Sequence, residues 1–570
     1  MTSLDWALVV VINLGIVIYG VWVIKSKDES FDYFLAAKTL PWWAVGLSAF
    51  GTAVDTGDYV AVAGGAYRFG ISQLAFWWLG LAVGWFVLSF FVLKAMYRTG
   101  MYTNAEWLEF RFGPITRVLA VFINIQSRTN VLGNIYFSMF LVLNIVAGVP
   151  RGWSWVVVVL VALTAIAYIV TGGLRSDVIT DVMQAVPMVI GSFVLGGAVW
   201  WSVGGWSGLT AKLTAIDPKL PAQLLHVGGY SPGGVPPTVV VFGMVIALIA
   251  YATINQYEAI RFLGARSEWD YKMAAVVASV VTSATLWFNI TMGPLARADF
   301  PDLKIVDQAY PLMITKYLPA GLIGIVVAGL VAAGYSTFDS IGIGISSLFV
   351  RDLYARFFVK NATDAHYTLV GKLSVPFVIA LGFVYVPFLG APGMFAFYIR
   401  LAGAISVPLM TVMLMGVFTR VHRATGSIGL VAGLLYGVSA IVADFNRWGW
   451  PTWYVSPWWA YVWNIVIPAL VMVAASAIID RVRGPVKDEE LLGLVFTGRE
   501  VPPAQLRDSI AKRLKALEGT WLQKTLREAR PMPKYPFPVP AEGLPWYKSP
   551  ERWTWGYVVV VCFFLFFILW

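Results

Sequence analysis

Hydrophobic runs of membrane-spanning length recur along almost the whole chain. A transmembrane helix needs about 20 predominantly apolar residues. Runs of that length fall near residues 4–24, 40–66, 71–95, 117–148, 152–171, 178–203, 236–261, 271–297, 319–349, 367–389, 393–418, 426–444, 456–480 and 554–570. The sequence therefore predicts an all-α, polytopic membrane protein with about 14 transmembrane helices.

The composition excludes several classes of function. Of the 570 residues, 59% are hydrophobic and 13% are charged, whereas soluble domains carry about 25% charged residues. The single cysteine, Cys562, and three scattered histidines form no disulfide or zinc motif. The net charge of +10 is interpreted as the basic bias of cytoplasmic loops. We therefore expect neither an enzyme nor a nucleic-acid-binding protein.

Basic residues gather in every second connection between the expected spans. They include Lys25, Lys27, Lys38, Lys94, Arg98, Arg111, Arg117, Arg175, Arg261, Arg266, Lys272, Arg351, Arg356, Lys360, Arg420 and Arg423. Connections rich in Lys and Arg face the cytoplasm. The sequence thus predicts a multi-pass protein of the cell (plasma or inner) membrane with both termini outside.

A long polar stretch, 480–552, separates the last two expected spans and is assigned to the cytoplasm. Within it, Leu506, Ile510, Leu514, Leu517 and Trp521 share one face of an amphipathic helix. Two interpretations remain open: the helix lies on the membrane surface, or it packs on the protein's own cytoplasmic face. The Pro-rich run that follows is expected to be an extended connector.

Ionisable residues inside apolar spans indicate function, because charge in mid-membrane is costly. The second span carries Asp55 and Asp58 beside small residues, which favours a broken helix whose free carbonyls line a cavity. The alternative is a helix crossing packed through small residues. In the ninth span, Asp339 stands among hydroxyls, and such oxygen ligands suit Na⁺.

Two further charged residues allow two interpretations each. Arg128, within NIQSRTN, either pairs with Asp55, Asp58 or Asp339 or recognises an anion. Asp181 is either functional or an acid at the membrane interface.

Several motifs together resemble the sodium:solute symporter family, which includes sodium-coupled sugar, proline, sialic acid and monocarboxylate carriers. They occur in the family's order over about residues 31–420. The motifs are FDYFLAAKTLPWWAVGLSAFGTAV, GGLRSDVITDVMQ, NQYEAIRFLGAR and GLIGIVVAGLVAAGYSTFDSIGIGISSLFVRDLY.

The resemblance implies two five-helix repeats of inverted topology, with broken first and sixth core helices. The expected division of the chain is a first peripheral span and loop (1–39), a ten-helix transporter core (40–420), two peripheral spans (421–480), a cytoplasmic amphipathic and Pro-rich segment (481–552), and a final span (553–570).

The resemblance also implies ion sites. The family's shared Na⁺ site corresponds to carbonyls of Gly51, Val54 and Ala333 and to the hydroxyls of Ser336 and Thr337. A second ion site of some members corresponds to Asp181, Ser336, Asp339 and Ser340. Because Asp339 replaces the usual hydroxyl, this second site is expected to hold a cation or a proton.

The sugar-binding residues of the galactose carriers are mostly absent. Only Asn255 matches, because Asp58 replaces a glutamine and the second core helix offers Trp77 and Trp78. The expected solute site comprises Asp58, Trp77, Trp78, Arg128, Asn255 and Tyr398, which favours a small zwitterion or carboxylate over a hexose.

The sequence thus predicts a secondary active transporter that couples the symport of a small organic solute to Na⁺ by alternating access. Its expected partners are the solute, Na⁺ and the lipid bilayer. The alternatives are a proton-coupled carrier of the same fold and a solute sensor.

Overall fold

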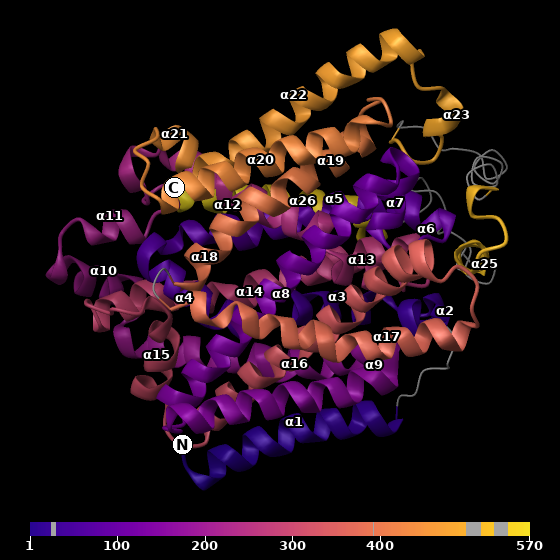
Figure 1. The fold of residues 1–570 in the computed structure, drawn as a ribbon. Helices are drawn as coiled ribbons and strands as arrows, with labels where there is room; N and C mark the ends of the chain where they lie inside the picture. Colours follow the sequence, from indigo (N-terminus) through magenta and orange to yellow (C-terminus); the bar gives the residue numbers. More distant parts are fainter. Residues whose placement is uncertain (24–29, 391–392, 497–514, 529–544) are drawn as a thin grey trace.

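The computed structural model is an all-helical bundle (Figure 1), and it describes residues 1–23, 30–390, 393–496, 515–528 and 545–570. No β-strand occurs in these residues. The N-terminal half contains α1 (Ser3–Val23), α2 (Ser30–Leu35), α3 (Trp42–Ala53), α4 (Thr56–Phe69), α5 (Ala82–Val87), α6 (Leu93–Thr99), α7 (Asn104–Phe112), α8 (Pro114–Ile145), α9 (Arg151–Val203), α10 (Gly205–Ile216), α11 (Leu220–Leu224), α12 (Pro237–Ile254) and α13 (Gln256–Leu263).

The C-terminal half contains α14 (Glu268–Asp299), α15 (Ala309–Tyr317), α16 (Leu322–Leu348), α17 (Asp364–Leu381), α18 (Met394–Leu401), α19 (Val407–Phe418), α20 (Thr425–Phe445), α21 (Thr452–Val455), α22 (Pro457–Arg483), α23 (Asp488–Leu491), α25 (Trp521–Glu528) and α26 (Pro550–Phe563). Both chain ends lie at the same end of the bundle, on the left in Figure 1.

Eleven helices of the described residues are long and apolar enough to cross a membrane. The other three predicted spans fall on the interrupted pair α3 and α4, on the polar helix α8, and on the first part of α9, of which Arg151–Ala167 is a shorter apolar helix. α9 is interrupted at Gly173, whose φ of 61° brings its backbone against Tyr33. The count of 14 remains a prediction.

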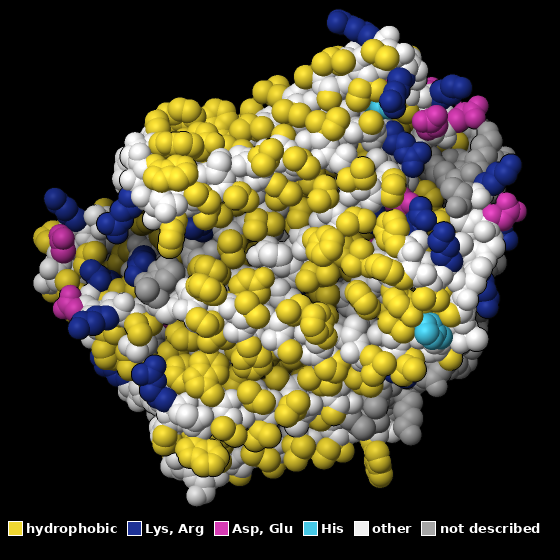
Figure 2. Space-filling view, viewed as in Figure 1, with side chains coloured by type: hydrophobic (Ala, Val, Ile, Leu, Met, Phe, Trp, Pro, Cys, Tyr) yellow, Lys and Arg dark blue, Asp and Glu magenta, His cyan; other side chains and the backbone are white. Residues whose placement is uncertain are grey.

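The molecular surface matches a membrane protein. Figure 2 shows hydrophobic side chains over the middle of the face in view, with Lys and Arg concentrated at its two ends. α1, for example, exposes Val11 and Ile18. Such a broad apolar belt is stable only in contact with lipid. The chain is therefore a multi-pass membrane protein.

One end of the bundle is held by a buried ion-pair network. Arg351 pairs with Glu106 at 2.8 Å, and Arg117 pairs with Asp352 at 2.6 Å, all with side chains at most 2% exposed. Glu109 also pairs with Arg117. This network joins α7, the start of α8 and the helical extension of α16, which continues to residue 358.

α25 packs against this same end. The Trp521 indole stacks on Tyr367 at 4.0 Å and donates to the Asp364 carboxylate at 2.7 Å, while Thr525 accepts from Arg351 at 3.0 Å. Of the predicted amphipathic helix, residues 506–514 lie outside the described residues. Its last residue, Trp521, packs on the protein's own surface.

Candidate functional site

Two helix pairs are interrupted at the centre of the bundle. The first interruption separates α3 from α4 at Val54 and Asp55. Asp55 caps α4 by accepting from the Asp58 N–H at 3.0 Å, and the Asp58 carboxylate accepts from the Asp55 N–H at 3.0 Å. Such a reciprocal cap fixes the start of a new helix, and the end of α3 leaves backbone carbonyls without intrahelical partners.

The second interruption lies at Asn255, between α12 and α13. Asn255 is fully buried, and its amide nitrogen and oxygen have no hydrogen-bond partner among the described residues. The start of the first pair and the end of the second are tied together, because the backbone N–H of Arg266 donates to the Leu40 carbonyl at 3.0 Å. The interruption between α3 and α4 is the break that was predicted near Gly51 to Asp58.

The carbonyls released by the first break face hydroxyls of α16. Ser336 donates to the Gly51 carbonyl at 2.6 Å and to the Ala333 carbonyl at 2.9 Å. Thr337 donates to the Thr52 carbonyl at 3.2 Å.

Most of the predicted Na⁺ ligands are therefore close together. Gly51, Ala333 and Ser336 are directly linked, and Thr337 lies beside them. Val54 is buried at the break itself, where it ends α3. The oxygen-rich donor set at this position suits Na⁺, since hard cations prefer oxygen ligands.

Three buried carboxylates form a second cluster beside this site. Asp177, Asp181 and Asp339 each offer an oxygen within 4.8 Å of the others. Ser340 links the two clusters, because its hydroxyl lies 3.0 Å from that of Thr52 and donates to Asp177 at 3.3 Å. Asp181 is fully buried within the protein.

Arg261 partly balances the charge of this cluster. Its guanidinium lies 2.7 Å from Asp177 and 3.2 Å from Asp181, and it donates to Ser48 at 2.8 Å. Sequence reasoning assigned Arg261 to a basic loop, and this assignment was wrong because α13 carries the side chain, fully buried, back into the bundle. The sequence does contain a signal for this cation: Asp177 and Asp181 stand one helical turn apart, and two buried acids need a positively charged partner.

A small cavity lies above the first break. It has a volume of about 40 Å³, room for a few water molecules. The side chains around it are Ala53, Asp55, Gly57, Asp58, Ala61, Phe76, Trp77, Val131, Asn134, Leu248, Tyr251, Met394, Phe395 and Tyr398. Of the predicted solute ligands, Asp58, Trp77 and Tyr398 are brought together here. Carboxylates are present in this lining, but no Arg or Lys is.

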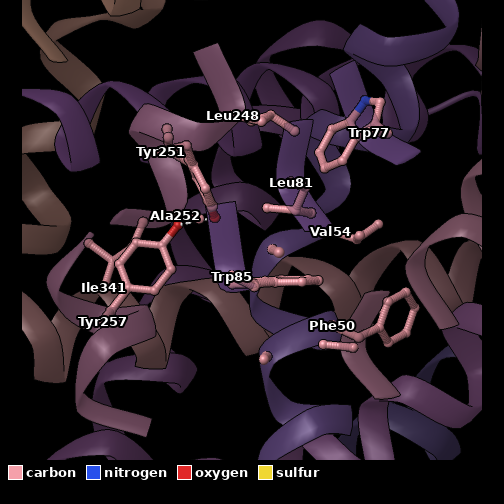
Figure 3. Packing of buried hydrophobic residues seen from close by; sticks show 14 of the residues in the cluster. Phe50, Val54, Trp77, Leu81, Trp85, Leu248, Tyr251, Ala252, Tyr257 and Ile341 are labelled. Carbon is pink, nitrogen blue, oxygen red and sulfur yellow. Dashed lines mark hydrogen bonds between the residues drawn. The ribbon is translucent and has the colours of Figure 1, made fainter. Parts of the chain in front are cut away.

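Arg128 lies next to the cavity rather than in its wall. Its guanidinium is 4.7 Å from the Tyr251 ring and 5.6 Å from the Tyr257 ring. The two tyrosine hydroxyls point toward each other and lie 2.6 Å apart (Figure 3). Arg128 is 1% exposed, and its Nε has no partner among the described residues. It is thus held by hydroxyls and aromatic faces, with a further hydrogen bond to Ser127.

Two other predicted ligands are placed apart from the cavity lining. The Trp78 indole donates to the Ser283 carbonyl at 3.0 Å and packs on Trp287. Asn255 lies at the second break. Trp78 is therefore directed toward α14, away from the site.

Asp307, which sequence reasoning did not select, supports the wall of the cavity. Its carboxylate accepts from the N–H of Met394, the first residue of α18, at 3.0 Å. Burial raises the pKa of Asp307 to about 7, against the opposing effects of that hydrogen bond and of Arg68. The Asp307 carboxylate also lies against the backbone of Gly64 in α4. Only glycine leaves room for it, since a Cβ on residue 64 would lie 2.5 Å from the carboxylate.

Comparison with known proteins gives a consistent result. The sequence model of the "Sodium:solute symporter family" matches residues 33–437. A sodium/glucose cotransporter of Vibrio parahaemolyticus is 28% identical over 469 residues, which cover 76% of this chain and 83% of the relative. Sodium/myo-inositol cotransporter 2 of Bos taurus is 29% identical over 77% of this chain and 70% of its own.

Solved structures share the fold. A Na⁺-coupled sialic acid symporter in a substrate-bound outward-open state superimposes with a TM-score of 0.70 at 20% identity, covering 85% of this chain and 99% of that one. A nucleobase-cation-symport-1 family transporter superimposes with a TM-score of 0.51 at 12% identity, covering 84% and 98%.

Proposed function

Because this chain belongs to the sodium:solute symporter family, and is thus a Na⁺-coupled solute symporter rather than an enzyme, we propose that its coupling Na⁺ binds between α3 and α16. The ligands are the carbonyls of Gly51, Val54 and Ala333 and the hydroxyls of Ser336 and Thr337. The observation that supports this most is the Ser336 hydroxyl, 2.6 Å from a carbonyl at the end of the broken helix.

Bound Na⁺ stabilises the conformation in which α3 stays against α16. A ligand shifts a conformational equilibrium only by its differential affinity for the two states. The oxygen cage exists only while these helices are in contact, so Na⁺ favours that state and keeps the solute site formed. One charge moving down the membrane potential contributes about 2.3 kcal/mol per 100 mV to solute accumulation.

The acid cluster serves as a second cation or proton site, made by Asp181, Ser336, Asp339 and Ser340. Three carboxylates and one guanidinium, all buried, leave an excess of negative charge when every acid is ionised. Such an excess in mid-membrane requires a cation or protons. Asp181 supports this assignment, because its Oδ1 has no partner among the described residues.

The solute carries a group that donates hydrogen bonds toward Asp55 and Asp58 and packs against Trp77. A small zwitterion fits best, with its ammonium group on Asp58 and its carboxylate reaching Arg128 past Tyr251 and Tyr398. A carboxylate alone is less favoured, because two acids line the cavity.

A sugar or polyol is the second candidate solute. The relatives named for glucose and myo-inositol favour it. Acids, amides and aromatic rings are also suitable partners for hydroxyl-rich ligands. Arg128 beside the site favours the zwitterion, because a guanidinium bonds a carboxylate more strongly than it bonds the neutral hydroxyls of a polyol.

A binding screen with the purified protein tests both parts of the proposal. Zwitterionic amino acids, carboxylates, sugars and polyols are added in Na⁺ and in choline buffer, and the melting temperature is recorded. We expect stabilisation by a zwitterion in Na⁺ only. Arg128→Gln should abolish that response and leave the response to Na⁺ itself intact. Equal stabilisation in choline would instead favour a proton-coupled carrier or a sensor, and stabilisation by a sugar would replace the zwitterion.

The remaining assignments complete the proposed organisation. Residues 40–420 form the transporter core, 1–39 and 421–480 add peripheral spans, 481–552 lies in the cytoplasm, and 553–570 is a final span. Both termini face outward from the cell membrane.

A further inference from the structure

An apolar cavity separate from the transport site lies between α1, α4, α8, α9 and α16. Its volume is about 240 Å³. Its lining is mainly aliphatic and includes Val10 and Leu14 of α1, Met139 of α8, Val157 and Val161 of α9, and Thr56 of α4. Val327, Val331 and Tyr335 recur at intervals of four residues and so share one face of α16, whereas Ser336 lies on another face.

The cavity is suited to hydrocarbon rather than water. Its polar side chains use their donors within the protein: Asn13 donates to the Ala328 carbonyl at 3.2 Å, and Thr56 donates to the Leu330 carbonyl at 2.6 Å. The hydroxyls of Thr164 and Tyr335 bond each other at 2.6 Å. Among the described residues that line the cavity, the Asn13 Oδ1 is the one buried side-chain atom without a hydrogen-bond partner. A buried water needs two to four polar partners, so this single acceptor does not hold one.

The cavity is continuous with the surface that faces the bilayer. Val10 and Leu14 of α1 line it, yet they are 51% and 49% exposed. α1 lies at the edge of the bundle, beside α9 and α16 (Figure 1). In a membrane, the molecules that meet this opening are the acyl chains of lipids.

We propose that this cavity binds one acyl chain of a membrane lipid. Its volume exceeds the roughly 150 Å³ of an engineered apolar cavity that binds benzene, so a segment of an alkyl chain has room to enter. The chain end enters from the bilayer between α1 and the first part of α9, and it contacts the valines of α9 and α16. An empty cavity of this size would forfeit these packing contacts.

An acyl chain in this position also supports the ion site from behind. Thr56 is the first residue of α4, directly after the break, and its hydroxyl ties that break to α16 one turn before Ala333. Filling the cavity should therefore favour the contact between the broken helix and α16, and with it Na⁺ binding. This consequence rests on the sodium site proposed above, whereas lipid binding itself does not.

Photolabelling in lipid nanodiscs tests the proposal on the full-length protein. The phospholipid carries a diazirine near the end of one acyl chain, and the labelled residues are mapped by mass spectrometry. We expect carbene insertion at lining residues such as Met139, Val157 and Val327. Labelling confined to outward-facing residues such as Val11, Ile18 and Leu160 would overturn the proposal.

A matched pair of variants sharpens the result. Val161→Trp fills the cavity, whereas Leu160→Trp places the same ring on the outward face of α9, where Leu160 is 55% exposed. Labelling of the lining should fall about tenfold in the first variant, because packed interiors exclude further groups, and should persist in the second. Equal labelling in both variants would contradict acyl-chain binding in this cavity. If Val161→Trp does not fold, the labelling pattern of the wild-type protein alone decides between a lipid chain in the cavity and one confined to the outer surface.

The coupling to Na⁺ has its own readout. In detergent, added phospholipid should lower the Na⁺ concentration that half-maximally raises the melting temperature of Leu160→Trp, and it should leave that of Val161→Trp unchanged, because the new ring already fills the cavity. If lining residues are labelled but added phospholipid leaves the Leu160→Trp midpoint unchanged, the lipid site stands and its link to the ion site is refuted.

Discussion

Replacing Ser336 by alanine should weaken Na⁺ binding strongly while leaving the fold intact. The hydroxyl bridges the Gly51 and Ala333 carbonyls at 2.6 and 2.9 Å, so it contacts both sides of the proposed ion cage. A hydrogen bond to a charged group contributes about 1.5–3 kcal/mol, and we take the loss of one hydroxyl ligand of Na⁺ to be of the same order. At 1.4 kcal/mol per factor of ten, the Na⁺ midpoint should rise roughly 10- to 100-fold.

The assay is Na⁺-dependent thermal stabilisation, titrated with choline replacing Na⁺ at constant ionic strength. Ser279→Ala is the matched control, because this buried hydroxyl only donates to the Ala275 carbonyl of its own helix at 2.7 Å. The control should shift the Na⁺ midpoint little. A Ser336→Ala variant that binds Na⁺ as the wild type does would refute the placement of the ion between α3 and α16.

Three further predictions concern other parts of the structure. Arg261→Gln leaves Asp177 and Asp181 buried without their cation, so it should lower the free energy of unfolding by about 3–5 kcal/mol in urea titrations; adding Asp177→Asn should recover part of this loss, and a fully stable Arg261→Gln protein would contradict the ion pairing. Burial raises the pKa of Asp307 from its ordinary value of 3.8 to about 7. Between these values the folded state binds more protons than the unfolded state, so wild-type stability falls as the pH rises through that window. Asp307→Asn should therefore gain in melting temperature relative to wild type at pH 8 and not at pH 4, and identical pH profiles would disprove the effect. Trp521→Ala removes the stack on Tyr367 and should speed hydrogen exchange in residues 521–528, whereas unchanged exchange would show that Trp521 does not hold α25 in place.

The spans and the first helix break could be predicted because their signals are local. Uninterrupted hydrophobic runs identify membrane helices directly, and the acids and small residues from Gly51 to Asp58 oppose a continuous helix. The hydroxyls of Ser336 and Thr337 stood out for the same reason, since polar groups are rare in apolar spans.

The contacts between distant residues could not be predicted in this way. Counting positive charges in loops assigned Arg261 by its position in the chain, but helix packing decides whether such a side chain faces water or a buried acid. For Arg128 the sequence left an ion pair and anion recognition open, and it gave no sign of the tyrosine rings that the structure places against the guanidinium. The apolar cavity beside α1 depends on how five separate helices pack, which no local pattern encodes.

Uptake into proteoliposomes tests the central claim most directly. The purified protein is reconstituted, a zwitterionic solute identified by the binding screen is added outside, and an inward Na⁺ gradient is compared with choline and with an inward pH gradient. We predict that the Na⁺ gradient, without a pH gradient, drives accumulation of the solute above its equilibrium concentration. At low Na⁺, the Ser336→Ala variant should lose this accumulation. Accumulation driven by the pH gradient in the absence of Na⁺, and unaffected by Ser336→Ala, would contradict Na⁺ coupling at the helix break.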